Sequence, residues 1–365
     1  MSAASSSVPE VLSPAPVPAR SGRPPPDAPR AVVFGCAGPE LSAAERDFFA
    51  AAQPLGFILF RRNVETPEQV ARLTGDLRRA VGRPHAPVLV DQEGGRVARL
   101  RPPHWPEFPA ARRFGEVWER DPERAVEAVR ANGRLLAETL RPLGITVDCM
   151  PVLDVPVPGS HDVIGDRAYS ANPIAVAQLG LAAAEGLLEG GVLPVVKHMP
   201  GHGRAAADSH LELPTVAASE AELTAHDFAP FRALRYMPLG MTAHVRYLAL
   251  DAARPATLSP VVLGEFVRDR IGFAGLLFSD DLSMAALGGP IAERAAAAVA
   301  AGCDVALHCN GDLGEMALVA EAVPAMGRHA LRRWQIAEDV RRRSRRAADD
   351  PSRLAAWRDL MLVSG

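Results

Sequence analysis

Eight short aliphatic runs recur along the chain, and longer helix-forming stretches separate them. They lie at residues 31–38, 56–60, 87–95, 145–155, 192–201, 239–245, 274–284 and 303–310. Continuous apolar runs of this length are typical of parallel strands covered by helices on both faces. Between them, "TPEQ" (66–69) and "SEAE" (219–222) have the pattern of a helix capping box. Eight such alternations in one chain predict an α/β fold, a single-domain (β/α)8 TIM-type barrel.

A doubly wound open sheet is the alternative to a barrel. No GxGxxG motif follows the first run, however, which weakens a dinucleotide-binding version of that fold. Polar residues come where the apolar runs end, and barrel enzymes build their active sites at the carboxyl ends of their strands. These residues are Asp91, Asp154, Lys197 with His198, His244, Asp280, and His308 with Asn310. Their positions favour the barrel.

The composition argues against several classes of protein. The chain has 365 residues, of which 48% are hydrophobic and 23% charged, as is typical of a soluble globular protein. A formal net charge of −3 argues against nucleic-acid binding. No apolar run reaches the roughly 20 residues that span a bilayer, and the N-terminus lacks the features of a secretory signal. The four cysteines are expected to be free thiols in a reducing compartment, so we predict a cytoplasmic protein.

Composition also divides the chain into three parts. Residues 1–30 are rich in Pro, Ser and Ala and are predicted to form a disordered tail. Residues 31–327 form the predicted barrel. Residues 328–365 are rich in arginine, and the apolar residues spaced along them predict a terminal helical tail packed on the barrel with a solvated basic face.

The stretch "VVKHMPGHGRAAADSH" (195–210) concentrates several reactive side chains. Lys197 is the only lysine in the chain, although Lys and Arg together number 40. A position that keeps lysine against this bias indicates a need for a compact ammonium. Asp208 lies two residues before His210, a spacing at which a carboxylate can orient and charge an imidazole as an acid or base. The small residues before this pair predict a mobile loop that closes over a ligand.

Two other strand ends offer polar groups for a ligand. Asp91, in "DQEGGRVARL", could accept hydrogen bonds from adjacent hydroxyl groups while Arg99 donates, or it could cap the turn. Arg167, in the loop "VIGDRAYS", could donate to a polyol or remain a solvated surface residue.

The motif "FSDDLSM" (278–284) places two consecutive carboxylates after an apolar strand. One of Asp280 and Asp281 is expected to point into the barrel mouth, where it could be a nucleophile, a base or a metal ligand. His198, His202, Asp208 and His210 are also capable zinc ligands. The HExxH spacing is absent, however, and a lysine beside His198 would add positive charge near a cation. We therefore expect neither a metal nor a cofactor.

Taken together, the motifs "DQEGGRVARL", "VIGDRAYS", "KHMPGHGRAAADSH", "TAHV" and "FSDDLSMAAL" resemble those of the β-N-acetylglucosaminidases of glycoside hydrolase family 3 that act in bacterial cell-wall recycling. The resemblance runs from about residue 31 to about residue 325, with the motifs in the family's order. It implies a barrel of the TIM type that acts as an exo-β-N-acetylglucosaminidase on peptidoglycan fragments. We expect a monomer that acts on a small carbohydrate.

The resemblance also implies roles for individual residues. Asp280 is the expected nucleophile, and His210, polarised by Asp208, is the expected general acid/base. The expected sugar-binding residues are Asp91, Arg99, Arg167, Lys197 and His198, and His244 is expected to line the site. A retaining glycosidase needs a nucleophile and a proton donor on opposite sides of the anomeric carbon, and Asp280 with His210 would supply both. Lys197 would then bind sugar hydroxyl groups where a guanidinium is too wide.

Four alternatives remain open from the residues. The enzyme could act on another β-linked sugar, such as glucose or xylose. A histidine acid/base, unlike a carboxylate, need not repel phosphate, so phosphorolysis of β-N-acetylglucosaminides is also conceivable. From other classes, the chain could be a metal-dependent barrel hydrolase, which a chelator would inhibit, or a sugar-binding barrel without catalytic activity.

Overall fold

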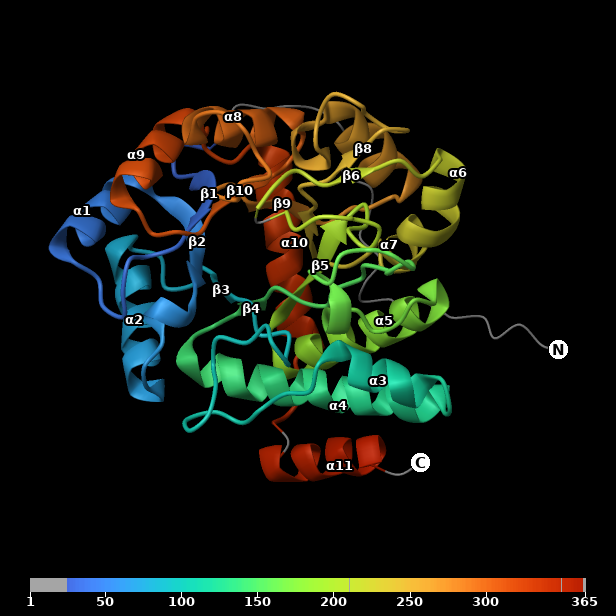
Figure 1. The fold of residues 1–365 in the computed structure, drawn as a ribbon. Helices are drawn as coiled ribbons and strands as arrows, with labels where there is room; N and C mark the ends of the chain where they lie inside the picture. Colours follow the sequence, from blue (N-terminus) through green and yellow to red (C-terminus); the bar gives the residue numbers. More distant parts are fainter. Residues whose placement is uncertain (1–24, 210, 349, 364–365) are drawn as a thin grey trace.

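The computed structural model describes residues 25–209, 211–348 and 350–363, and its strands close into a barrel (Figure 1). Eight parallel strands form the barrel in the order β1-β10-β9-β7-β5-β4-β3-β2. Their bounds are β1 Arg30–Phe34, β2 Pro54–Leu59, β3 Val88–Val90, β4 Val147–Asp148, β5 Leu193–Met199, β7 Leu239–Thr242, β9 Leu276–Asp281 and β10 Val305–His308. The barrel closes where β1 pairs with β10. The predicted (β/α)8 fold is confirmed.

Helices surround the strands (Figure 1). The α-helices are α1 Ala43–Ala52, α2 Pro67–Ala80, α3 Ala111–Trp118, α4 Pro122–Leu140, α5 Pro173–Gly190, α6 Glu220–Glu222, α7 Phe228–Ala233, α8 Ile291–Ala301, α9 Leu313–Ala322, α10 Arg328–Ser344 and α11 Pro351–Val363. Wider π-helical turns form η5 Leu223–Asp227 and η7 Val262–Arg270, and 3-10 turns form η2 Arg61–Asn63, η3 Arg141–Leu143, η4 Gly165–Arg167 and η6 Ala256–Leu258.

The two predicted capping boxes have different outcomes. At 219–222 both bonds form, because Ser219 Oγ accepts from the Glu222 amide and a Glu222 carboxylate oxygen accepts from the Ser219 amide. At 66–69, Thr66 caps the amide of Gln69 at 3.2 Å. The Gln69 side chain, however, accepts from the amide of Glu65 instead of closing the box. The helix start was correct there, and the reciprocal bond was wrong.

Several strands are shorter than the apolar runs predict. The run at 87–95 contains three strand residues, and the run at 145–155 contains two. Pro151 has no N–H to donate to a neighbouring strand, and the amide of Gln92 binds the side chain of Asp148 at 3.0 Å. The chain therefore leaves the sheet early at these points and forms loops around the barrel mouth.

An additional two-stranded parallel sheet lies outside the barrel. It pairs β6 (Thr215–Val216) with β8 (Arg246–Tyr247). β6 follows the loop after β5, and β8 follows the end of β7, so the small sheet ties together two loops at the mouth. No apolar run predicted it, because each strand has only two residues.

The end of the chain contacts the opposite end of the barrel. Arg333 of α10 forms an ion pair with Asp304, just before β10, at 2.7 Å. Arg341 donates to the carbonyl of Gly191, just before β5, at 3.4 Å. The helix α10 therefore packs against the amino-terminal ends of the strands, and α11 lies beside α4 (Figure 1).

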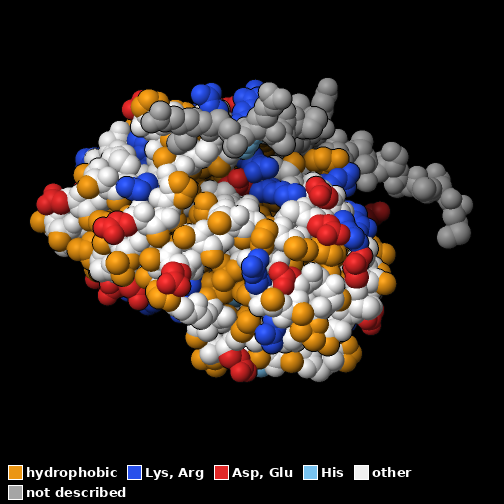
Figure 2. Space-filling model, turned by 90° about the horizontal axis from the view of Figure 1, so that it is seen from above, with side chains coloured by type: hydrophobic (Ala, Val, Ile, Leu, Met, Phe, Trp, Pro, Cys, Tyr) orange, Lys and Arg blue, Asp and Glu red, His pale blue; other side chains and the backbone are white. Residues whose placement is uncertain are grey.

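The predicted tail at residues 1–30 falls largely outside the described residues. Over the face shown in Figure 2, acidic, basic and hydrophobic side chains are interspersed. Within the described ranges, no helix has the length and apolarity needed to cross a membrane.

Candidate active site

A cavity of about 270 Å³ opens at the carboxyl ends of the barrel strands. Its polar lining consists of Asp91, Glu93, Arg99, Arg167, Lys197, His198, His202, Ser209, Asp280 and Asp281, and its apolar lining includes Ile58, Phe60, Val97, Val163, Ile164, Met241, Met284 and Leu307. Six predicted site residues are thus brought to one cavity: Asp91, Arg99, Arg167, Lys197, His198 and Asp280. Their individual roles remain predictions.

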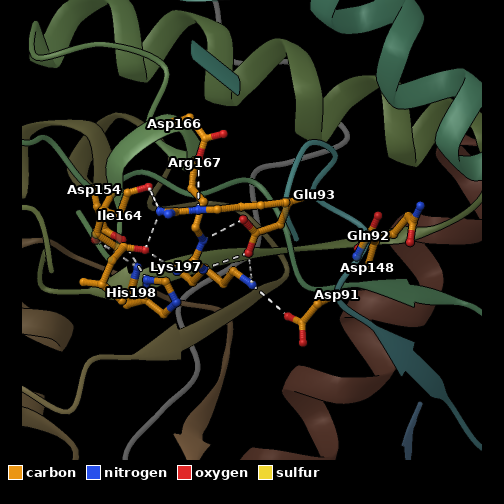
Figure 3. A network of polar contacts seen from close by, with 12 residues as sticks. Asp91, Gln92, Glu93, Asp148, Asp154, Ile164, Asp166, Arg167, Lys197 and His198 are labelled. Atoms are coloured by element: carbon orange, nitrogen blue, oxygen red, sulfur yellow. Dashed lines mark hydrogen bonds and ion pairs between the residues drawn. The ribbon is translucent and has the colours of Figure 1, made fainter. Parts of the chain in front are cut away.

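Lys197, at the end of β5, is the buried cation of this cavity. Its side chain is only 2% exposed, and its Nζ lies 2.9 Å from Asp91 Oδ1 and 2.7 Å from Glu93 Oε1 (Figure 3). Burial alone would lower the pKa of the ammonium, but the two carboxylates raise it above its usual range. The ammonium therefore stays charged. An ammonium has three protons to donate, and these contacts use two of them.

Asp91 follows β3 and joins Lys197 to Arg99. Arg99 Nη2 donates to Asp91 Oδ2 at 2.9 Å, and the guanidinium of Arg99 lies 5.0 Å from the ring centroid of Phe60. Burial would raise the pKa of Asp91, but Lys197 and Arg99 hold it well below its ordinary value. Asp91 is therefore an ionised acceptor, held between two cations.

Arg167 makes a bidentate ion pair with Glu93. Its Nε and Nη2 donate to Glu93 Oε2 at 2.9 Å and Oε1 at 2.8 Å (Figure 3). Burial would raise the pKa of Glu93, but Arg167 and Lys197 lower it to about 2. The arginine that the sequence left as a candidate donor is therefore largely covered, with its side chain 11% exposed, and is fixed by a carboxylate that the sequence analysis did not single out.

Asp154, in the loop after β4, organises the start of the loop after β5. Its Oδ2 accepts from His198 Nδ1 at 2.7 Å, and its Oδ1 accepts from the amides of His198 and His202 at 3.2 and 2.6 Å. Burial would raise the pKa of Asp154, but the two histidines and their amides lower it to about 2. With Nδ1 bound to this carboxylate, His198 has its Nε2 available for a ligand in the cavity.

His202 holds the far end of the same loop. Its Nε2 lies 3.0 Å from Ser209 Oγ, and burial lowers the pKa of the imidazole to about 4. His202 is therefore neutral at physiological pH. Arg204 anchors the middle of the loop, because its Nε donates to Asp227 of η5 at 2.6 Å.

The predicted acid/base pair lies at the end of this loop. The main-chain carbonyl of Asp208 accepts from the amides of Leu211 and Glu212 at 2.9 and 3.0 Å, so the chain turns tightly there. His210 itself lies outside the described residues. The proposed polarisation of His210 by Asp208, and the closing of the loop over a ligand, therefore stay predictions.

Asp280 and Asp281 end β9 in different environments. The Asp281 amide donates to Asp280 Oδ1 at 2.8 Å. Burial would raise the pKa of Asp280, but His198 and the Asp281 amide lower it on balance. The Asp281 carboxylate instead accepts from Ser283 and from the amide of Cys309. Asp280 is thus ionised with only one oxygen held by the adjacent amide, while Asp281 braces the loop.

His244 is fully buried beside these carboxylates. Its Nδ1 lies 2.8 Å from Thr257 Oγ1, and its Nε2 lies 2.9 Å from the main-chain oxygen of Asp281. Both ring nitrogens are therefore bonded to the protein.

Gln92 and Asp148 support the wall that carries Asp91. The Gln92 side chain accepts from the amides of Arg99 and Leu100 at 2.9 and 3.0 Å and donates to the Leu100 carbonyl. Asp148 Oδ1 accepts from the Gln92 amide, whereas its buried Oδ2 has no partner in the described part of the chain. Figure 3 shows both side chains on the same side of the network as Asp91. The bond from the Arg99 amide to the Gln92 side chain holds Arg99 where its guanidinium contacts Asp91.

A metal site is not apparent in the described part of the chain. Across residues 25–209, 211–348 and 350–363, no group of three or more His, Cys, Asp and Glu side chains is placed to hold a metal ion. The four cysteines are all buried and free.

Several functional residues were missed from the sequence. Glu93 carried a usable signal, because it lies two residues after Asp91, and alternate residues of an extended segment point to the same side. Ser209 and Thr257 carried none, since isolated hydroxyl residues in loops are common. Only the folded chain brings them to His202 and His244.

Comparison with known proteins identifies relatives over most of the chain. The family described as "Glycosyl hydrolase family 3 N terminal domain" matches residues 32–344. A beta-hexosaminidase from Alkalilimnicola ehrlichii is 42% identical over 302 residues, which cover 82% of this chain and 83% of the relative. A beta-hexosaminidase from Neisseria meningitidis serogroup B is 43% identical over 260 residues, which cover 70% and 71% of the two chains.

Solved structures show the same similarity. NagZ from Neisseria gonorrhoeae in complex with N-trifluoroacetyl-D-glucosamine superposes with a TM-score of 0.80 at 34% identity, covering 92% of this chain and 98% of that one. The same protein in complex with zinc ion superposes with a TM-score of 0.79 at 34% identity, again covering 92% and 98%.

Proposed function

The chain belongs to glycosyl hydrolase family 3, and from this premise we infer that it is a retaining exo-β-N-acetylglucosaminidase. Its curated relatives are beta-hexosaminidases, and a structural relative binds an N-acylated glucosamine. The observation that carries the inference is an ionised Asp280 in a cavity of about 270 Å³ lined by buried ion pairs. Ligand pockets commonly enclose about 300–1,000 Å³, and this cavity is slightly smaller than that range, so it suits one terminal sugar, as exo action requires.

Asp280 is the proposed nucleophile. Its Oδ1 is held by the Asp281 amide, and within the described residues its Oδ2 has no hydrogen-bond partner. Oδ2 would attack the anomeric carbon of the sugar as the bond from that carbon to the leaving oxygen breaks. The product of this step is a covalent glycosyl-aspartate, as in other retaining glycosidases that use a carboxylate nucleophile.

His210, with Asp208, is the proposed acid/base. Protonated His210 would give its proton to the leaving oxygen in the first step. In the second step the neutral ring would take a proton from water, and the resulting hydroxide would displace Asp280 and release the sugar with retained configuration. The cavity lining supports this pairing, since Ser209, the residue between Asp208 and His210 in the sequence, lines the cavity.

The proposed sugar-binding groups are the ion-paired cations and carboxylates that line the same cavity as Asp280. Asp91 is a charged acceptor for hydroxyl groups, and Arg99 and Lys197 are donors on either side of it. The third proton of Lys197 is available to a sugar hydroxyl. His198 would donate or accept through Nε2, because Asp154 holds its Nδ1.

The substrate class follows from the relatives, and its finer details are part of this proposal. We expect the enzyme to remove N-acetylglucosamine from peptidoglycan fragments in the cytoplasm and to act as a monomer. Four buried free thiols fit a reducing compartment.

The test is release of a chromophore from an aryl β-N-acetylglucosaminide and, in parallel, from the matching aryl β-glucoside. Wild type and Asp280→Asn are assayed with and without EDTA, and with added phosphate. We expect turnover of the N-acetyl substrate only, unaffected by EDTA and abolished in Asp280→Asn.

Each other outcome selects a different function. Turnover of the glucoside would move the enzyme to another branch of the family, and a sugar phosphate formed with phosphate would make it a phosphorylase. Loss of wild-type turnover on addition of EDTA would support a metal-dependent hydrolase. The EDTA assay is included because the Neisseria gonorrhoeae relative has been solved in complex with zinc ion.

A further inference from the structure

A closed ring of hydrogen bonds lies behind the proposed nucleophile. The Asp280 amide donates to Thr242 Oγ1 at 3.3 Å, and Thr242 Oγ1 lies 2.7 Å from Thr257 Oγ1. Thr257 Oγ1 lies 2.8 Å from His244 Nδ1, and His244 Nε2 lies 2.9 Å from the Asp281 main-chain oxygen. These bonds therefore lead from the amide of Asp280 to the carbonyl of Asp281, and the backbone between these two groups closes the ring.

The chemistry of the groups gives this ring one direction. A carbonyl oxygen only accepts, so His244 Nε2 carries the proton in its bond to Asp281. Burial lowers the pKa of His244, so its imidazole is neutral, and the imidazole Nδ1 accepts from the Thr257 hydroxyl. Thr257 has only one proton, which His244 Nδ1 at 2.8 Å and the Ala243 carbonyl at 3.0 Å share as acceptors, so the Thr242 hydroxyl must donate to Thr257. Thr242 then accepts from the Asp280 amide, and every donor in the ring has an acceptor.

All three side chains of the ring are fully buried and come from different segments. Thr242 ends β7, His244 follows it, and Thr257 belongs to η6. In a buried site, bonds linked in one direction strengthen one another, and an unmade bond is costly. Thr257 can reach the nucleophile only through this ring, since its hydroxyl bonds are to Thr242, His244 and the carbonyl of Ala243.

We propose that Thr257 is a positioning residue for the nucleophile: with Thr242 and His244 it clamps the backbone on both sides of Asp280. The clamp matters because the amide of Asp281 lies inside it and donates to Asp280 Oδ1 at 2.8 Å. Fixing the backbone thus fixes the carboxylate, and Oδ2 stays aimed at the anomeric carbon. This inference rests on the proposed function and gives His244 a positioning role in place of the role in lining the site that the family resemblance implies.

The test compares Thr257→Val, which keeps the shape and removes the hydroxyl, with Thr257→Ser, which keeps the hydroxyl. Thr74→Val is the matched control, because Thr74 of α2 is equally buried and donates to main-chain carbonyls far from the cavity. For each protein we would measure kcat and KM on the aryl β-N-acetylglucosaminide, the Kd for N-acetylglucosamine, and the Tm.

The expected result is a fall in kcat of about ten- to a hundredfold in Thr257→Val, since a small misplacement of a reacting group has effects of this size. The Kd for the sugar should stay within about twofold, Thr257→Ser should recover most of the kcat, and Thr74→Val should lower only the Tm. In the double variant Thr242→Val/Thr257→Val, the loss should be much less than the product of the single losses, because both changes break one ring.

Three results would overturn the proposal. One is wild-type kcat in Thr257→Val, and another is an equal loss of kcat in Thr74→Val. The third is a weakened Kd for the sugar with unchanged kcat, which would assign the ring to substrate binding. Failure of the proposed function is distinguishable, because wild type itself would then not turn over the N-acetyl substrate, and the positioning role would fall with it.

Discussion

The only lysine of the chain is an ion-pair centre. Lys197 is nearly fully buried, and its ammonium lies within 2.9 Å of both Asp91 and Glu93. A guanidinium is larger and planar, so it cannot donate from one point to two carboxylates and a sugar hydroxyl. The bias toward arginine in the sequence pointed to this residue, but the sequence could not supply its second partner, Glu93.

We predict that Lys197→Arg lowers kcat/KM about a hundredfold, since a misplacement of about 1 Å in a group that positions the substrate can have an effect of this size. The matched control is the reverse exchange, Arg343→Lys, at an exposed position of α10, which should leave kcat/KM unchanged. Steady-state kinetics on the aryl β-N-acetylglucosaminide decide the matter. Full activity in Lys197→Arg would remove the special role of the ammonium.

Asp148 gives a prediction about pH. Burial raises its pKa to about 8, whereas an aspartate in an unfolded chain titrates near about 3.9. Between these values the folded protein binds the extra proton, so Asp148 makes stability fall as the pH rises from about 4 to about 8. Asp148→Asn should therefore leave the free energy of unfolding nearly unchanged at pH 4 and raise it increasingly toward pH 8. Urea unfolding across this range tests the slope, and an equal effect at every pH would refute the assignment.

At the scale of elements, the loop after β5 has three attachments. Asp154 holds its first amides, Arg204 binds Asp227 in its middle, and His202 binds Ser209 near its end. The sequence predicted a mobile loop from its small residues. These side-chain anchors join residues that are 7 to 48 positions apart, so local composition could not predict them.

Loss of the contact between His202 and Ser209 should affect catalysis more than stability. Ser209→Ala removes the hydroxyl that binds His202 and loosens the segment that carries the proposed acid/base. We expect kcat to fall about tenfold, with a small change in Tm. Ser170→Ala is the control, since this buried hydroxyl caps a turn outside the cavity. If the two variants had the same kcat, the attachment would be irrelevant to catalysis.

The strands were predictable because each is a continuous apolar run, and each site residue that ends a strand was predictable with it. The short strands β6 and β8 and the turn η6 have no such pattern. Thr257 belongs to η6, and Ser209 lies in the loop after β5. Such irregular positions explain why the supports of the site were harder to predict than its charged lining.

For the whole molecule, the C-terminal helices support the barrel away from its mouth. Arg358 of α11 is nearly buried and donates to Asn132 of α4 at 3.2 Å. We predict that Arg358→Ala lowers the free energy of unfolding by about 1–3 kcal/mol, because it leaves the Asn132 side chain without this partner. Arg353→Ala, at an exposed position of the same helix, should change little. Both variants should keep kcat/KM within about twofold of wild type. A large loss of activity in Arg358→Ala would contradict the prediction that the C-terminal helices support stability and not catalysis.

The central claim is that Asp280 forms a covalent bond to the sugar. The most direct measurement is mass spectrometry of the protein after reaction with a fluorinated N-acetylglucosaminyl fluoride, which forms the glycosyl-enzyme faster than water releases it. We predict one added sugar, mapped by proteolysis to Asp280 and absent from Asp280→Asn. A label on Asp281, or no label from a wild-type enzyme that turns over the aryl substrate, would contradict the account.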